Sequence, residues 1–289
     1  MRNIFPEFIY NELKKNKNIH ILLGDIGVHS FRKVFQKYNN NILNIGVLEQ
    51  SMVSFASGLA LEKKIPFIHT IAPFLVNRAL EQIKIDACYQ NQNINIVTVG
   101  SSIDYSALGP THHCCDDIGI LNNLPNIKIY TPGNRDEFIQ VLKNYKEQKP
   151  KYFRISNFSH SKKFKLKKNY KLLKKGKKGL VVVIGAALRF IENYYKEIDA
   201  NIVYCNIVKP LNKNILRKYY KKKIILIQDF YVESITGSVL KCFSGLPVQI
   251  EEIGLPKIFF RKNGSAIENY DFYGLSKNNI KKKIRNFLK

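Results

Sequence analysis

The chain has 289 residues, of which 45% are hydrophobic, 12% aromatic and 24% charged. This composition is typical of a folded globular protein and excludes disordered, collagen-like and disulfide-scaffold proteins, while the length predicts two domains. Lys and Arg number 47 against 22 Asp and Glu, a net charge of +25, so nucleic-acid binding has to be weighed beside enzymatic functions.

The first half of the chain alternates short apolar, β-rich runs with helical patterns. The runs predict strands at 19–23, 41–45, 66–70, 94–99, 127–130 and 152–155. Two helices are predicted between them: 49–61, which begins with an acidic residue suited to a helix N-terminus, and 74–89, which has apolar residues at helical spacing. This alternation is typical of α/β units around a parallel sheet.

The second half of the chain shows the same alternation of apolar, strand-like runs and helical patterns. Strands are predicted at 180–185, 201–207, 223–229 and 247–254, and a helix at 278–288. We therefore predict an α/β fold of two domains, residues 1–157 and 179–289, with parallel or mixed sheets flanked by helices. The lysine-rich segment 158–178 between them is predicted to be a linker, because it is charged and has no apolar period.

Most of the excess positive charge lies in the second half, in the linker and in lysine clusters at 221–223 and 281–283. Lysine carries most of it, without the guanidinium forks that read bases or bind phosphates. A solvated lysine surface is the main interpretation. A basic module that binds polyanions is the alternative.

The five cysteines form no CxxC pair, which indicates neither a zinc site nor a disulfide framework and favours a reducing compartment. The longest apolar run, 180–188, is far shorter than the about 20 residues of a membrane-spanning helix. Pro6 and Glu7 interrupt the stretch that a secretory signal would keep apolar. We therefore expect a cytoplasmic protein.

The segment 109–119, GPTHHCCDDIG, places two His, two Cys and two Asp side by side. Neighbouring residues on one backbone point in different directions, so they form a poor metal site, and we predict no metal ligand in this chain. Two interpretations stay open: a loop-to-helix junction, or a substrate-binding loop. In the second, Gly109-Pro110 forms a turn, and Thr111-His112 presents a hydroxyl and an imidazole at the carboxyl end of a strand.

Glu49 and Phe74 are the other two candidates. Glu49 has apolar and small neighbours, so it is either a helix-start residue or a buried functional acid. Phe74 taken alone is read as a core residue. Neither residue is assigned a function by its own surroundings.

Taken in order, the strings resemble the transketolases and their thiamine-diphosphate relatives. The pyrimidine-binding domain of that family is similar to GVLEQSMVSFASGLA (46–60), PFLVNRALEQIKIDA (73–87), GPTHHCCDDIGILNNLPNIKIYTPGN (109–134) and YFRISN (152–157). Its C-terminal domain is similar to VVVIGAALRFIE (181–192), CNIVKPLN (205–212), LIQDFYVESITGSVL (226–240) and FYGLSKNNI (272–280). The resemblance covers nearly the whole chain.

The resemblance implies a second polypeptide. Family members bind the cofactor's diphosphate through a metal held by an N-terminal domain with Gly-Asp-Gly and a later Asn. Here GDIG (24–27) has Ile26 in the third place, and residues 45–59 contain no Asn. The chain therefore resembles the C-terminal subunit of a split transketolase-like enzyme. Thiamine diphosphate would be the cofactor, Mg²⁺ or Ca²⁺ would be held by an N-terminal partner subunit, and an α₂β₂ assembly is expected.

The resemblance also implies roles for five residues in the transfer of a two-carbon ketol unit between sugars or sugar phosphates. A glutamate at the position of Glu49 hydrogen-bonds N1′ of the cofactor's aminopyrimidine, and Phe74 matches the aromatic residue that stacks on that ring. Asp25 matches an acidic residue near the cofactor. His112 matches the substrate-facing histidine, and Arg154 falls where transketolases keep an arginine for the sugar phosphate, a contact that suits a guanidinium.

Two departures from the family pattern concern the substrate. Ala107-Leu108 stand where transketolases usually have Glu-Asp, and Gly100 stands where they have a second histidine. Both changes indicate a ketose donor or acceptor other than the ordinary pentose phosphates. The β chain of a 2-oxo-acid dehydrogenase or decarboxylase is the alternative within the same fold, although the GPTHH string is typical of the sugar-transferring branch. A non-catalytic basic binding module is the alternative from another class.

Overall fold

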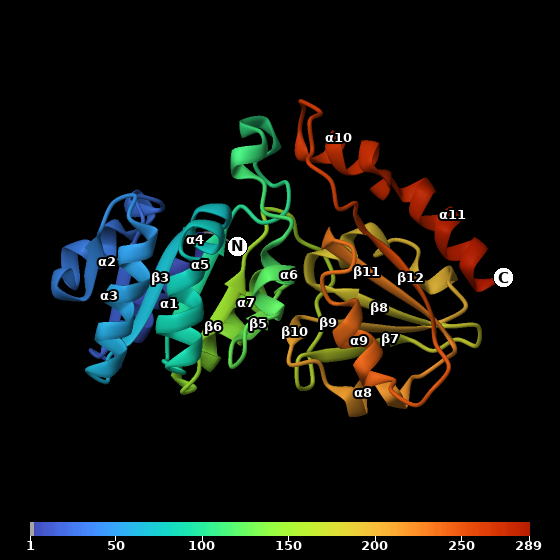
Figure 1. Ribbon diagram of the computed structural model, residues 1–289, viewed down its shortest axis with the longest axis horizontal. Coiled ribbons are helices and arrows are strands. Elements are labelled where there is room, and N and C mark those ends of the chain that lie inside the picture. The colour runs from blue at the N-terminus through green and yellow to red at the C-terminus, as the bar shows by residue number, and fades with distance from the viewer. Residues whose placement is uncertain (1–2) are drawn as a thin grey trace.

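The computed structural model describes residues 3–289 and contains two β-sheets flanked by helices (Figure 1). The first sheet has seven strands in the order β10-β5-β6-β4-β3-β1-β2. Their bounds are β1 Ile19–Leu23, β2 Ile42–Asn44, β3 Ile65–Ile71, β4 Asn95–Val99, β5 Lys128–Tyr130, β6 Lys151–Arg154 and β10 Ile207–Lys209. All neighbouring pairs are parallel except β10 with β5, so the sheet is mixed.

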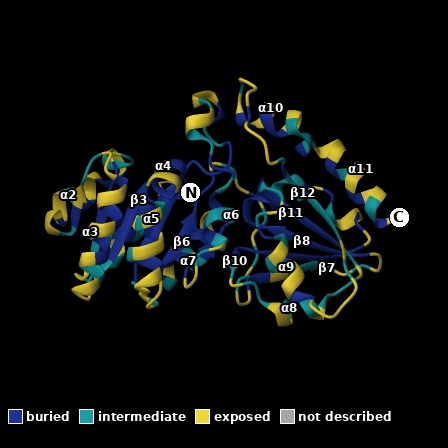
Figure 2. Ribbon diagram, viewed as in Figure 1, coloured by how far each residue is buried: buried dark blue, intermediate teal, exposed yellow. Residues whose placement is uncertain are grey.

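Helices pack on this first sheet and leave their outer faces to solvent (Figure 2). They are α1 Ile4–Leu13, α2 Arg32–Lys37, α3 Glu49–Leu61, α4 Ala72–Arg78, α5 Leu80–Gln82, α6 Asp117–Asn122 and α7 Arg135–Leu142. Because β1, β3, β4 and β6 are parallel, the loops that follow their carboxyl ends meet at one edge of the sheet. In open α/β folds this edge is where ligands bind.

The second sheet has five strands in the order β12-β11-β8-β9-β7. Their bounds are β7 Tyr170–Lys174, β8 Leu180–Ile184, β9 Asn201–Cys205, β11 Lys223–Tyr231 and β12 Gln249–Leu255. Only β7 is antiparallel to its neighbour. The helices of this half are α8 Lys213–Lys218, α9 Thr236–Cys242, α10 Ala266–Tyr270 and α11 Lys277–Leu288. The predicted α/β fold with parallel or mixed sheets flanked by helices is thus confirmed.

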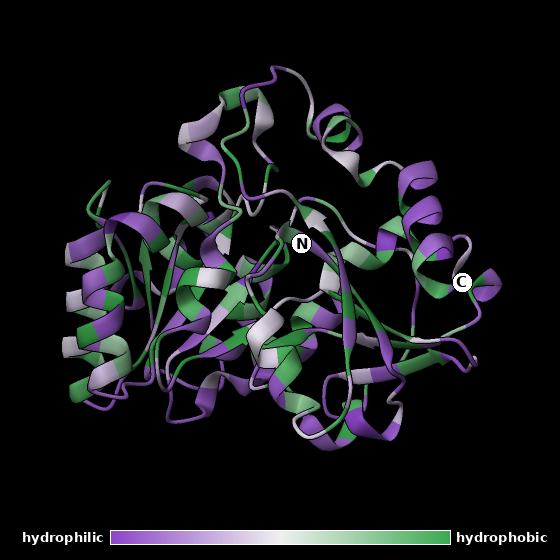
Figure 3. Ribbon diagram, turned by 45° about the vertical axis from the view of Figure 1, so that its right-hand side comes forward, coloured by the Kyte–Doolittle hydropathy of each residue, from purple (hydrophilic) through white to green (hydrophobic). Residues whose placement is uncertain are grey.

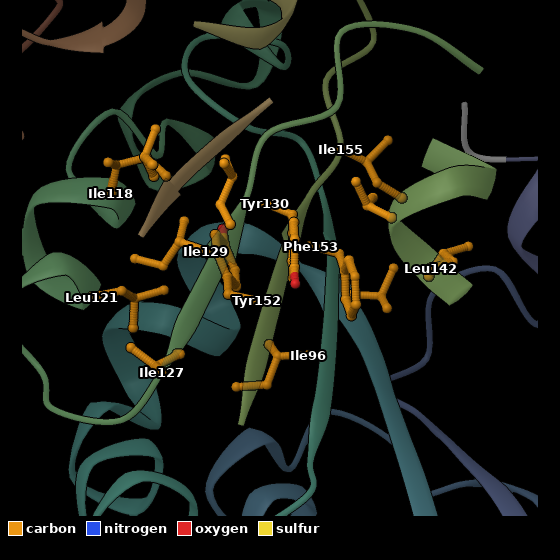
Figure 4. Close-up of a cluster of buried hydrophobic side chains, with 14 of the residues drawn as sticks. Ile96, Ile118, Leu121, Ile127, Ile129, Tyr130, Leu142, Tyr152, Phe153 and Ile155 are labelled. Carbon is orange, nitrogen blue, oxygen red and sulfur yellow. The ribbon is translucent and has the colours of Figure 1, made fainter. Parts of the chain in front are cut away.

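The core of the first half lies between strands and the helices on their two faces. Figure 4 shows strands β5 and β6 between Ile118 and Leu121 of α6 on one side and Leu142 of α7 on the other. On the strands, the Tyr130 and Phe153 rings stack with centroids 5.2 Å apart and planes 10° apart. Central parallel strands need apolar side chains on both faces, which explains why the sequence shows them as nearly continuous apolar runs.

The lysine-rich segment differs from its prediction as a linker. Residues 170–174 form β7, which pairs with β9 at the edge of the second sheet. Tyr170 is buried, Lys171 is exposed and residues 172–174 are intermediate, so only the first residue of this strand gives a clear burial signal among the lysines. Only the part of the segment before β7 runs between the two sheets.

Two further elements differ from the sequence-based expectations. The run 201–207 is divided, because β9 belongs to the second sheet and β10 adds to the first beside β5. The predicted helix 74–89 is α4 and α5 followed by η3, Ile83–Tyr89, which is wound as a π-helix. Strand β10 therefore ties the second half of the chain to the first sheet.

Hydropathy follows the layers: the strands carry mostly hydrophobic residues, while α11 and the other outer helices mix both kinds (Figure 3). In α11 the buried residues Ile280, Ile284 and Leu288 recur every fourth position, as expected for an amphipathic helix. Within residues 3–289, no helix has the length and apolar character needed to cross a membrane.

Candidate functional site

Glu49 is buried at the first position of α3, directly after the loop that follows β2. Only 2% of its surface is exposed. Its Oε2 accepts a hydrogen bond from Nη1 of Arg78 at 3.3 Å, while Oε1 is buried without a hydrogen-bond partner among the described residues. A buried acceptor without a partner is costly, and native structures usually satisfy it with a bound group or water. Glu49 therefore has an oxygen positioned for an additional donor.

Phe74 lies on α4, which starts at the carboxyl end of β3, and it is partly exposed. The Arg78 guanidinium carbon stands 4.1 Å from the centroid of the Phe74 ring. Residues four apart on a helix share a face, so α4 itself brings these two side chains together. Arg78 thus bridges the carboxylate of Glu49 and the ring of Phe74.

His112 reaches the same place from the loop that follows β4. The neck of this loop is closed by reciprocal backbone hydrogen bonds between Ser102 and Cys114, at 2.7 and 2.8 Å. His112 lies in the short helix η5, Pro110–His112, and its ring centroid is 5.1 Å from that of Phe74. The structure therefore joins Glu49, Arg78, Phe74 and His112 in one continuous group, which we call the Glu49 cluster.

Asp25 lies at the same edge of the sheet, just beyond the end of β1, and is exposed. Its backbone N–H donates to Oδ1 of Asn44 at 3.0 Å, and Nδ2 of Asn44 donates to Oδ1 of Asp25 at 3.2 Å. In the described part of the chain it contacts Asn44 rather than the Glu49 cluster. Its predicted position near the cofactor stays a prediction.

Arg154 is placed differently from its expected role at the sugar phosphate. Its side chain is only 3% exposed and donates to Oδ2 of Asp117 at 2.8 Å, to Oδ1 of Asp229 at 3.0 Å and to Oγ of Ser102 at 2.6 Å. Burial alone would lower its pKa, but the two carboxylates raise the pKa well above its usual value. With every nitrogen of the guanidinium engaged inside the protein, the phosphate assignment does not fit this geometry.

The Arg154 network instead connects the two halves of the chain at the foot of the His112 loop. Asp229 comes from β11 and also accepts from Nη1 of Arg189 at 3.3 Å. Asp104, within the loop, accepts from the backbone N–H of Asn157 at 2.7 Å, and burial raises the pKa of Asp104 to about 7. The network therefore connects the base of the loop to both halves of the chain.

The histidines and cysteines of the 109–119 segment point in different directions, as expected for adjacent residues. The His112 ring packs against Phe74, whereas the His113 ring packs against Phe260 of the second half with centroids 5.9 Å apart. Cys114 and Cys115 are buried, and burial raises the pKa of both thiols well above the usual range. Among residues 3–289, no three His, Cys, Asp or Glu side chains gather as a metal site would require.

Two residues of the site were missed at the sequence level. Arg78 had a usable signal, because its spacing of four from Phe74 predicts contact on a helix. Tyr105, whose ring centroid is 6.4 Å from that of His112, had none, because the course of the loop decides where it lies.

Comparison with known proteins identifies the family of the chain. The model of the family described as transketolase, pyrimidine binding domain, matches residues 1–158. One of the subunits of an apulose-4-phosphate transketolase from Actinobacillus succinogenes is 27% identical over 88% of this chain and 88% of its own length. A putative transketolase C-terminal section of Methanocaldococcus jannaschii is 28% identical over 100% of this chain and 96% of its own length.

A similar fold is found in a solved structure described as a split gene transketolase, inactive beta4 tetramer. It superposes with a TM-score of 0.87 and covers 99% of this chain and 97% of its own, at 21% sequence identity. At that identity the likeness concerns the fold, and it extends over both sheets.

Proposed function

The chain belongs to the transketolase pyrimidine-binding-domain family, as its motifs predicted, and from that membership we propose that it is the C-terminal subunit of a two-chain, transketolase-like enzyme. The enzyme moves a two-carbon ketol unit from a ketose to an aldose. The observation that carries the proposal is Glu49: a buried carboxylate with one oxygen unpartnered among the described residues, beside a partly exposed aromatic ring and a histidine.

The described residues suit the pyrimidine part of thiamine diphosphate. Oε1 of Glu49 offers a buried hydrogen-bond acceptor to a ring nitrogen, and Phe74 offers a partly exposed aromatic surface beside it. When bound, thiamine diphosphate supplies the carbon nucleophile that takes up and releases the two-carbon unit. We assign its diphosphate, with Mg²⁺ or Ca²⁺, to the partner subunit.

The residues of this chain have separate roles in the proposed reaction. Glu49 holds a proton at the pyrimidine ring nitrogen, from a position that is only 2% exposed. His112 donates a hydrogen bond to the substrate oxygen on which negative charge develops. Oγ1 of Thr111, 2.9 Å from Nδ1 of His112, orients the imidazole. Arg78 positions Glu49 and Phe74 relative to each other.

An exposed apolar face around α3 supports a partner subunit. Large hydrophobic side chains are exposed there, with exposed fractions of 61% for Val47, 53% for Leu48 and 48% for Phe55. The neighbouring η3 adds the exposed side chains of Ile85 and Tyr89. Exposed apolar patches of this kind are typical of protein interfaces. The two elements are held together by a hydrogen bond from Ser54 to Asp86 of 2.6 Å. We call these five hydrophobic residues the α3 face and propose that the N-terminal subunit covers it, in an α₂β₂ assembly.

Substitution of Phe55 by Asp is expected to raise the Kd for the N-terminal subunit at least about 30-fold, because interface centres tolerate charge poorly. The Phe55 ring is half exposed, so the melting temperature of the isolated chain should change little. Binding is measured by calorimetry with the co-expressed partner. Phe259→Asp, at an 82% exposed position of the second half, is the matched control. Equal affinities for Phe55→Asp and wild type would place the partner elsewhere.

Reconstitution tests the proposed function. The chain is co-purified with a candidate partner that carries Gly-Asp-Gly and a downstream Asn, then supplied with thiamine diphosphate, Mg²⁺ and a panel of ketose and aldose phosphates. We expect transfer that needs both chains, with donors other than xylulose 5-phosphate preferred because Ala107-Leu108 replace the usual acidic pair. Turnover of 2-oxo acids but of no ketose would favour the dehydrogenase alternative. Partner-free binding of nucleic acid, with no turnover, would favour the basic module.

The reducing cytoplasm is part of the same proposal. All five cysteines, Cys88, Cys114, Cys115, Cys205 and Cys242, are free and buried. Thiols that stay unpaired fit a compartment in which disulfides do not form.

A further inference from the structure

Gly100 directly follows β4, in a backbone conformation that favours glycine, and the Tyr105 ring leaves no room for a side chain at this position. Its φ is +75°, in the left-handed region that costs other residues energy. A Cβ built on Gly100 would lie 2.2 Å from Cε2 and 2.5 Å from Cδ2 of the Tyr105 ring, far inside van der Waals contact. The volume in which a side chain at position 100 would begin is therefore filled by Tyr105.

Tyr105 in turn faces the Glu49 cluster. It comes from the His112 loop, just before the short helix η4, Ser106–Leu108. Its ring meets that of His112 edge to face, with centroids 6.4 Å apart and planes 85° apart, and the His112 ring also contacts Phe74. Tyr105, His112 and Phe74 thus form one continuous aromatic group, and all three side chains are partly exposed.

We propose that Tyr105 is a substrate-contacting residue that helps to select the sugar, taking the volume that Gly100 leaves open. This assignment rests on the proposed ketol transfer. Tyr105 differs from an imidazole at position 100 in chemistry, because a phenol presents a single oxygen that both donates and accepts a hydrogen bond. Its ring also packs against that of His112. It therefore fits a sugar hydroxyl next to the reacting carbonyl, and disfavours a bulky or charged group at that point.

The first test uses the assembled holoenzyme and the best ketose donor from reconstitution. Tyr105→Phe keeps the ring and removes the hydroxyl, so kcat/KM for that donor should fall by about 3- to 10-fold, as expected for one lost hydrogen bond. Affinity for thiamine diphosphate, measured by calorimetry, should stay within twofold. Tyr195→Phe, in the second half of the chain, is the matched control and should leave both quantities unchanged.

The proposed hydrogen bond between Tyr105 and the sugar also predicts which substrates are affected when the Tyr105 hydroxyl is removed. With a set of deoxy ketose donors, Tyr105→Phe should lower kcat/KM for every donor except the one that lacks the contacted hydroxyl. Equal kcat/KM for Tyr105→Phe and wild type with all donors, while His112→Asn lowers it, would overturn the assignment alone. No ketol transfer by the wild-type assembly would overturn the proposed function and this assignment with it.

A second test examines the shared volume without any turnover. Gly100→Ala should lower the melting temperature of the isolated chain, through backbone strain and through the clash with Tyr105. In a Tyr105→Ala background the strain persists and the clash is gone, so the further loss should be clearly smaller. Identical losses in both backgrounds would show that Tyr105 does not occupy this volume and would overturn the proposal at its geometric step.

Discussion

Glu49→Gln in the assembled enzyme is expected to lower kcat by at least about 10²-fold, the range associated with losing a general acid or base. Glutamine fills the same volume and still hydrogen-bonds, but it cannot hold and release a proton at the pyrimidine nitrogen. Because Glu49 is 2% exposed, bulk solvent has little access to this position to take over the proton transfer. Steady-state ketol transfer at saturating cofactor measures the effect.

Folding and assembly must be separated from chemistry in this experiment. Glu62→Gln at the exposed end of the same helix is the matched control, and it should leave kcat within twofold. The melting temperature of Glu49→Gln and its affinity for the N-terminal partner should stay near those of wild type, since the carboxylate's one described ionic partner, Arg78, is 45% exposed. Full activity of Glu49→Gln would reduce Glu49 to a helix-start residue and remove the basis of the proposed function.

Local sequence pattern was enough to predict most strands and the start of α3. Apolar runs at 19–23 and 180–184 are strands because buried parallel strands carry apolar residues on both faces. Glu49 begins α3 where predicted, since the preceding loop and the amphipathic run that follows are local features. The order of the motifs along the chain predicted the family, which needs no three-dimensional information.

Features that depend on distant residues were not predictable in this way. The lysine-rich stretch hid β7, because its pairing with β9 is decided by the whole second sheet. The π-helical winding of η3 has no periodic signature distinct from an ordinary helix. The carboxylate partners of Arg154 lie 37 and 75 residues away in the sequence. Local pattern could therefore identify the arginine but not the ion pairs that it forms.

Because Arg154 pairs with two buried carboxylates, its substitution is expected to have the largest effect on the stability of the chain. Arg154→Leu would leave Asp117 and Asp229 buried, with the first losing its ionic partner and the second retaining only Arg189 among the described residues. Removing one member of a buried charge network costs about 3–5 kcal/mol, so the melting temperature of the isolated chain should fall by roughly 10 °C. Differential scanning calorimetry measures the shift.

The experiment also distinguishes the two roles considered for this arginine. Arg135→Leu, which removes an ion pair of 3.6 Å to Glu7 between exposed side chains, is the matched control and should cost less than about 1 kcal/mol. Adding Asp117→Asn to Arg154→Leu should restore part of the stability, because one buried charge is removed with its lost partner. If Arg154→Leu instead kept its melting temperature and raised KM for phosphorylated sugars alone, the guanidinium would be a phosphate ligand. The Ser102–Cys114 neck would then hold the His112 loop without it.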